Sequence, residues 1–376
     1  MDCSLSHSIK FFAPNYATTH ARSLVFITTA RSSSSSYKKN EYSGLHAPLE
    51  LKTEAGRFLS GVFLNDKKEF KSTAKKMLEQ VGFDRDQALA RRDLSIESDE
   101  AFLHRRIAEL KELQCQTAVE DIMYLMIVSK FSEIKVHLIP RLSRCIYNGR
   151  VEILPSKDWQ LESIHSFDFL EMIREHLATV VGWRCNSNVK DAWATTKIQR
   201  LPLCQMYAAS ILYGYFLKSA SLRHHLEQNL GHILQDIGGT RAGIHTSLRE
   251  IGHLESRNIF FGHINGVQST SLGEVTQVSC TKNQGRLKGY VMRFDTETMA
   301  ICAKPWSKES VNLIQRHSNA LFGEQNKDLF ECNDMIHTSF ATLKRFALEA
   351  IAFGSFLWDA EEYVNTVYKL SDNLLE

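Results

Sequence analysis

Two pairs of residues have the spacing of a metal-binding helix face. Glu162 and His165, and more weakly Asp334 and His337, are three positions apart. Di-iron bundles use two such pairs together with a carboxylate from each of two further helices. Further carboxylates could come from Glu120, Asp121, Glu361 and Glu362. Glu162 and His165, however, precede a predicted helix, and such pairs are common by chance, so we predict no metal site.

Four other side chains are candidates for binding a small molecule: His176, His317, Trp183 and Arg223. The two histidines occupy equivalent positions in a repeat described below, and for each we prefer a cap or packing contact over catalysis. Trp183 follows a glycine and could line a groove. Arg223 opens the basic run "RHH", which is more typical of a solvated helix face than of an anion site.

Several common motifs of enzymes and cofactor sites are missing from the sequence. The chain has no GxGxxG, P-loop or GxSxG motif, each of which would indicate a defined chemistry. Its eight cysteines are scattered and include no CxxC pair, which argues against a zinc site. A Ser-His-Asp triad is spatial and stays open at this point. We therefore assign no catalytic residue and no cofactor.

The elements that position these residues are predicted to be helices. The most apolar stretch, Tyr207–Leu217, has eleven residues without a charge. A membrane span needs about 20, so we predict a buried helix and no membrane-spanning segment. A second long helix is expected from Asp99 to Phe131, with an amphipathic first part and a nearly all-apolar second part.

The apolar helix recurs later in the chain. "AASILYGYFLKSA" at 208–220 aligns without a gap on "LEAIAFGSFLWDA" at 348–360, with Ile211 matching Ile351 and Gly214 matching Gly354. The preceding segments also align, 166–182 on 307–323, with a capping serine at the start and a glycine at the end. A mid-helix glycine costs about 1 kcal/mol relative to alanine, so its recurrence suggests a close approach of two helices. A fainter third copy begins near Leu59.

We therefore expect an all-α fold of repeated helical units, two clear and one faint, packed as a helical bundle. The predicted organisation is a leader at 1–50, helical units at 51–140, 141–230 and 287–376, and a long flexible insertion at 231–286 that is rich in glycine and polar residues.

The leader and the charge restrict location and partners. Residues 1–40 contain one acid, Asp2, among many serines, threonines and basic residues, which is typical of an organelle transit peptide; a disordered tail is the alternative. Residues 1–50 hold five of the 45 basic and three of the 43 acidic residues, which leaves 40 of each in the rest of the chain. Nucleic-acid-binding domains usually carry a basic excess, so we expect no nucleic acid partner.

Three long stretches carry a resemblance: "VEDIMYLMIVSKFSEIKVHLIPRLSRCIYNGRVEILPSKDWQ", "YAASILYGYFLKSASLRHHLE" and "LEAIAFGSFLWDAEEYVNTVYKL". With them the chain resembles the plant UV-B-induced chloroplast proteins, which carry domain of unknown function 760 and include seed-maturation-like members. The resemblance covers nearly all of 50–371. It implies a plastid location and a helical domain, and it supplies no catalytic residues.

Two hypotheses follow. The first is a non-enzymatic chloroplast protein of the stroma that responds to UV-B or stress and acts through contacts with other stromal proteins. The alternative is a small-molecule or pigment-binding protein, or an enzyme, with a site between the repeats. The sequence does not predict the oligomeric state.

Overall fold

The computed structural model describes residues 47–97, 99–181, 194–239, 287–323 and 335–370. Trp183, most of the predicted leader and residues 240–286 of the predicted insertion lie outside these ranges. Apolar residues from all three predicted helical units, such as Leu59, Ile211 and Phe353, are buried in one common core.

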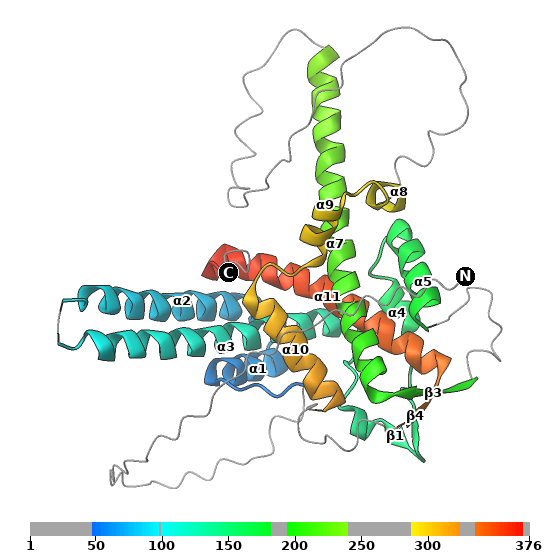
Figure 1. Ribbon diagram of the computed structural model, residues 1–376, viewed down its shortest axis with the longest axis horizontal. Coiled ribbons are helices and arrows are strands. Elements are labelled where there is room, and N and C mark those ends of the chain that lie inside the picture. Colours follow the sequence, from blue (N-terminus) through cyan, green and yellow to red (C-terminus); the bar gives the residue numbers. More distant parts are fainter. Residues whose placement is uncertain (1–46, 98, 182–193, 240–286, 324–334, 371–376) are drawn as a thin grey trace, which may run out of the picture. The chain divides into compact units, whose positions relative to one another are not determined.

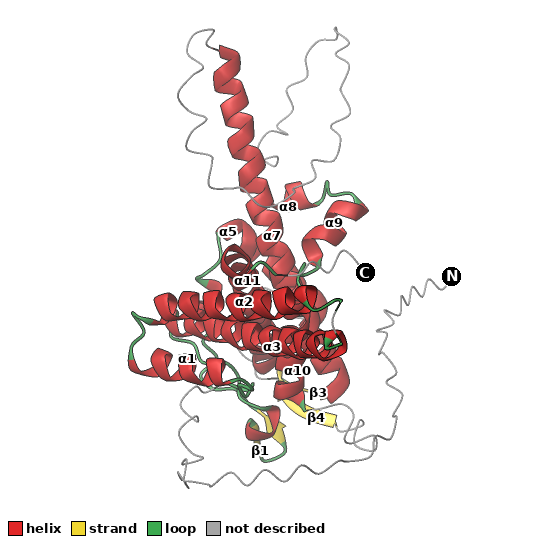
Figure 2. Cartoon of the chain, turned by 90° about the vertical axis from the view of Figure 1, so that its left-hand side faces the viewer, coloured by secondary structure: helices red, strands yellow, loops and turns green. Residues whose placement is uncertain are grey.

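The first three helices are α1 (Glu54–Asn65), α2 (Phe70–Leu94) and α3 (Ala101–Glu133). Thr53 caps α1, because its hydroxyl accepts a hydrogen bond from the Gly56 amide at 3.1 Å. α2 and α3 lie side by side as a helical hairpin (Figures 1 and 2). The long helix expected at 99–131 is confirmed as α3. Its second half is buried on nearly all sides, as predicted.

The remaining described helices lie before and after residues 240–286. Before them come the 3-10 turn η2 (Leu142–Arg144), α4 (Asp158–Glu162), α5 (Phe167–Val181) and α7 (Arg200–Gly239). After them come α8 (Leu287–Val291), α9 (Thr296–Ala303), α10 (Lys308–Phe322) and α11 (Phe340–Tyr368). α7 continues past the predicted boundary at 230. None of the described helices is both long and apolar enough to cross a membrane.

The fold is not purely helical, which corrects the all-α prediction. Within the described residues a small sheet contains β1 (Ile146–Tyr147), β2 (Arg150–Val151), β3 (Thr195–Gln199) and β4 (Met335–Ser339) in the order β1-β2-β4-β3. β3 pairs antiparallel with β4, and β2 pairs parallel with β4. The strands are too short for a clear alternating pattern, and β3 and β4 lead directly into α7 and α11.

The core is organised by the crossing of α7 and α11 (Figure 1). A Cβ atom at Gly214 would lie 2.0 Å from the Ile351 carbonyl oxygen, and one at Gly354 would lie 1.9 Å from the Ile211 carbonyl oxygen. Only glycine therefore allows the two backbones to approach so closely. The close approach predicted from the mid-helix glycines is confirmed.

Candidate functional site

A buried polar network surrounds Glu349, a fully buried residue of α11. Its carboxylate accepts hydrogen bonds from the Ile139 amide at 3.0 Å, from the Tyr207 hydroxyl at 3.2 Å and from Arg345 in an ion pair of 2.9 Å. Arg345 also donates to the His137 carbonyl at 3.0 Å. Burial raises the pKa of Glu349, and Arg345 opposes this shift. The pair thereby ties the segment after α3 to α11.

His317 of α10 extends this network. Its Nε2 lies 3.0 Å from the Tyr207 hydroxyl, and its ring stacks on Phe353 at a centroid distance of 4.3 Å. Because the Tyr207 hydroxyl donates to Glu349, His317 Nε2 carries the proton that Tyr207 accepts. Nδ1 is then the free basic nitrogen, and it is buried without a hydrogen-bond partner. Burial lowers the pKa of His317 to about 3.

Three other buried acids, Asp121, Glu120 and Glu361, also connect parts of the fold. In α3, Asp121 accepts from the Lys52 and Thr53 amides at 2.9 and 2.8 Å and pairs with Arg316 at 2.8 Å. Glu120 pairs with the same guanidinium at 2.7 Å. In α11, Glu361 accepts from the amide and hydroxyl of Ser307, the N-cap of α10, and from the Tyr215 hydroxyl. Asp121 therefore fastens the start of α1 to α3, Glu361 fastens the start of α10 to α11, and Glu120 ties α3 to the middle of α10.

This arrangement supports a structural role rather than chemistry on a bound molecule. Three of the four acids that could have completed a di-iron site, Glu120, Asp121 and Glu361, are occupied by amides, hydroxyls or arginine. Among the described residues no group of three or more His, Cys, Asp or Glu side chains could hold a metal ion.

Of the candidates, the structure describes His176, His317 and Arg223, and no hydrogen bond, ion pair or ring contact among the described residues joins these three. His176 lies 3.0 Å from the Ser210 hydroxyl and stacks on Tyr213 at 4.2 Å, and it shares no described partner with His317. Burial lowers its pKa to about 4. Arg223 pairs with Glu227 at 3.1 Å. These contacts are those of packing residues, and the ligand-binding role of the candidates stays a prediction.

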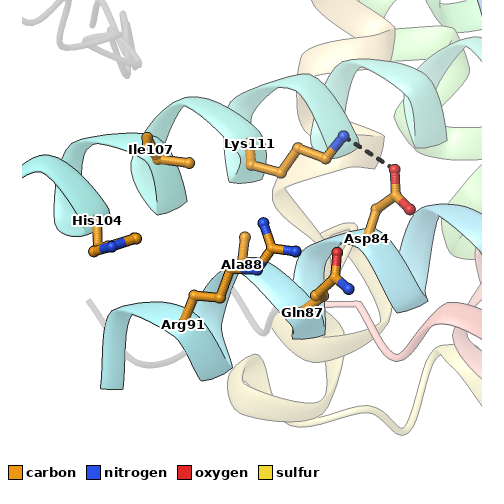
Figure 3. Close-up of a pocket in the computed structure, with 7 residues that line it drawn as sticks. All are labelled: Asp84, Gln87, Ala88, Arg91, His104, Ile107 and Lys111. Atoms are coloured by element: carbon orange, nitrogen blue, oxygen red, sulfur yellow. Dashed lines mark ion pairs between the residues drawn. The ribbon is translucent and has the colours of Figure 1, made fainter. Parts of the chain in front are cut away.

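A surface pocket of about 250 Å³ lies instead in the hairpin seam between α2 and α3 (Figure 3). Five of its seven lining residues are polar or charged, and Asp84 pairs with Lys111 at 3.0 Å across the seam. The other lining residues are Gln87, Ala88, Arg91, His104 and Ile107. The pocket contains none of the predicted candidates.

The hairpin also exposes many large apolar side chains, interspersed with charged ones such as Arg106 and Glu109. Eight large apolar side chains of the hairpin are between 44% and 87% exposed. We call this set the hairpin surface: Phe83, Leu94, Ile96, Phe102, Leu103, Ile107, Leu110 and Leu113. Single exposed apolar side chains are common, but Phe102, Leu103, Leu110 and Leu113 gather on one side of α3, which is typical of an interaction surface.

Sequence reasoning missed both the Glu349 network and the hairpin surface. The signal for the first is a charge inside an apolar helix, since Glu349 interrupts the run "FALEAIAF" and has Arg345 four residues before it. The signal for the second is a helix that is apolar on two faces in "AFLHRRIAEL", where one face suffices to pack on a neighbour.

The buried His317 predicts a specific pH dependence of stability. Its pKa of about 3 lies below the value of about 6.5 in the unfolded chain. The unfolded chain therefore binds the proton first, and stability falls as the pH drops below about 6.5, by up to about 1.4 kcal/mol per pH unit from this residue.

We expect the His317→Phe variant to lose this contribution, so that its unfolding free energy falls less steeply between pH 6.5 and 4 in urea titrations. Glu349 and Glu361, whose pKa values burial raises, are present in both proteins, so the difference between the curves isolates His317. The control His225→Gln, at an exposed position, should follow the wild-type curve. Parallel curves for His317→Phe and wild type would contradict the prediction.

The amino-acid sequence of the chain is similar to known proteins. Residues 102–230 match the family model "Protein of unknown function (DUF760)". The chain is 33% identical over 363 residues to a UV-B-induced, chloroplastic protein of Arabidopsis thaliana, covering 91% of this chain and 82% of that protein. No solved structure matches the chain significantly.

Proposed function

Because the chain belongs to the DUF760 family of proteins of unknown function, with the UV-B-induced chloroplastic protein of Arabidopsis as a relative, we propose that it is a UV-B- or stress-responsive chloroplast protein of the stroma. It acts without catalysis, through contacts with other proteins. The Ser-rich, acid-poor leader and the name of the relative support the location.

The observation that carries this proposal is the hairpin surface. Exposure of a large apolar side chain such as Phe102 or Leu94, at 86% and 87%, is unfavourable by about 1.5–3 kcal/mol relative to burial. The ion pair in the seam, between Asp84 and Lys111, does not remove these apolar side chains from water. A protein partner would bury the apolar side chains and leave the Asp84–Lys111 pair in place.

We further propose that the protein contains a duplicated helical unit, as the aligned segments suggest. Lys197 faces His337 in the β3–β4 pair, and these residues are 140 positions apart, as are Gly214 and Gly354 at the helix crossing. α5 packs on α11 and α10 packs on α7, so each copy covers the long helix of the other. An approximate two-fold axis through both pairs would account for these contacts.

The alternative function, a ligand site between the repeats, has less support. At the centre of the α7–α11 crossing the two backbones are in contact at Gly214 and Gly354, which leaves no space for a molecule. Several polar groups nearby are engaged with one another, as Tyr207 is with Glu349.

The test compares the size of the assembly that contains the full chain in chloroplast extract, by native gel electrophoresis. We expect the wild type to migrate above its monomer size and Leu110→Glu to migrate as a monomer, since a charge on the hairpin surface opposes burial. Leu226→Glu is the matched control, because Leu226 in α7 is 43% exposed and Leu110 is 45% exposed. A wild-type chain that migrates as a monomer would overturn the proposal.

A further inference from the structure

The outward face of α3 in the hairpin has a symmetrical residue pattern. Phe102, Arg106, Glu109 and Leu113 follow one another at spacings of four, three and four residues, which places them on one helix face. Ala108 and Cys115, which are buried, lie on the opposite face; Cys115 packs close to the Val81 carbonyl oxygen of α2. The outward face therefore reads apolar, basic, acidic, apolar.

All four side chains are open to solvent. Phe102 is 86% and Leu113 is 60% exposed, and the side chains of Arg106 and Glu109 are 68% and 49% exposed. Arg106 and Glu109 form an ion pair of 3.1 Å within the helix. Leu103 and Leu110 widen the face on one side, with exposures of 57% and 45%.

Such a face is complementary to itself in one orientation. If a second α3 lies antiparallel, with the two-fold axis between Ile107 and Ala108, Phe102 faces Leu113 of the second copy. Arg106 then faces Glu109 of the second copy, and Glu109 faces Arg106 of the second copy. A parallel arrangement would instead place Arg106 against Arg106 and Glu109 against Glu109, which is repulsive.

The size of the face is adequate for a dimer. Phe102, Leu103, Leu110 and Leu113 together expose roughly 500 Å² of apolar side chain, if a fully exposed large side chain contributes about 150–250 Å². A standard interface buries about 800 Å² per partner with a polar rim. The exposed Arg106 and Glu109 side chains can supply part of the polar rim.

We propose that the hairpin surface binds a second copy of this chain, through an isologous, antiparallel contact between the outward faces of α3. The two α3 helices then lie against each other across the two-fold axis, with each α2 on the far side of its own α3. This inference rests on the proposed function, because it identifies the first protein that the hairpin surface contacts.

A charge-swap experiment on the purified full chain tests the contact, with the monomer–dimer equilibrium measured by sedimentation equilibrium and native mass spectrometry. We expect the wild type to dimerise and both Arg106→Glu and Glu109→Arg to weaken the dimer by about tenfold or more, since each places like charges across the axis. The double variant Arg106→Glu/Glu109→Arg should return to within about threefold of wild type. Because both side chains are exposed, the variants should fold normally, which circular dichroism checks.

Three outcomes would overturn the inference: a monomeric wild type at all concentrations, single variants that dimerise like wild type, or a double variant that fails to recover. The outcome for the proposed function is separate. A purified monomer that still enters a larger assembly in chloroplast extract, sensitive to Leu110→Glu, would refute the second copy and keep the proposed function. A chain that is monomeric both in purified form and in extract would refute both.

Discussion

Gly354→Ala is expected to destabilise the protein by about 4 kcal/mol or more, enough to unfold a chain of ordinary stability of about 5–15 kcal/mol at moderate urea concentrations. The new Cβ would lie 1.9 Å from the Ile211 carbonyl oxygen, and backbone atoms cannot rotate away as a flexible side chain can. Gly214→Ala should behave in the same way, with its Cβ 2.0 Å from the Ile351 carbonyl oxygen. Urea unfolding followed by far-UV circular dichroism measures both effects.

The matched control is Gly61→Ala in α1. Gly61 is also helical, but a Cβ there meets no atom within 4 Å. Alanine should therefore stabilise the protein by up to about 1 kcal/mol through helix propensity. If Gly354→Ala were as stable as wild type, the two helices could not approach as closely as the structure shows.

The second large effect is expected for Glu349→Gln. Glutamine keeps the shape of the side chain but leaves the guanidinium of Arg345, which is 2% exposed, without a counter-charge. Breaking a buried ion pair by removing one partner costs about 3–5 kcal/mol. Urea unfolding at neutral pH provides the measurement.

Two further variants make this result specific. Glu79→Gln breaks a pair of the same i,i+4 spacing, Lys75–Glu79 at 3.9 Å, on the exposed face of α2, and should change stability by less than about 0.5 kcal/mol. Arg345→Met combined with Glu349→Gln removes both charges and should be less destabilised than Glu349→Gln alone. A double variant that is worse than the single one would show that hydrogen bonds, such as that of Arg345 to the His137 carbonyl, matter more than charge.

The sequence predicted the parts of the fold that depend on local patterns. The nearly continuous apolar residues in the second half of α3 were sufficient to predict a buried helix. The glycine in the middle of α7 was sufficient to predict a close helix crossing. The sheet was not predictable in this way, because Lys197 meets His337 from 140 residues away and each strand is at most five residues long. Pairing over that distance is not signalled by the residue types near each strand, because strand propensity depends on the neighbouring strands.

The candidate site shows the same division. The histidines were found because they recur in the aligned segments, but His176 contacts Ser210 and His317 contacts Tyr207, so their partners could not be inferred from the repeat. Glu349 had no recurring counterpart to draw attention to it. Its role depends on the Ile139 amide, a backbone group that the amino-acid sequence does not distinguish from any other.

The position of α11 has a consequence for how the chain reaches its folded state. This helix contacts α2, α3, α4, α5 and α7, yet it follows all of them in the sequence. A chain that emerges N-terminus first, from a ribosome or from an import pore, therefore presents the apolar sides of α3 and α7 to water until residue 368 has emerged. Chaperones would be needed during that interval, because unburied apolar helices aggregate. Early helices can form alone, but the core closes only after α11 has emerged.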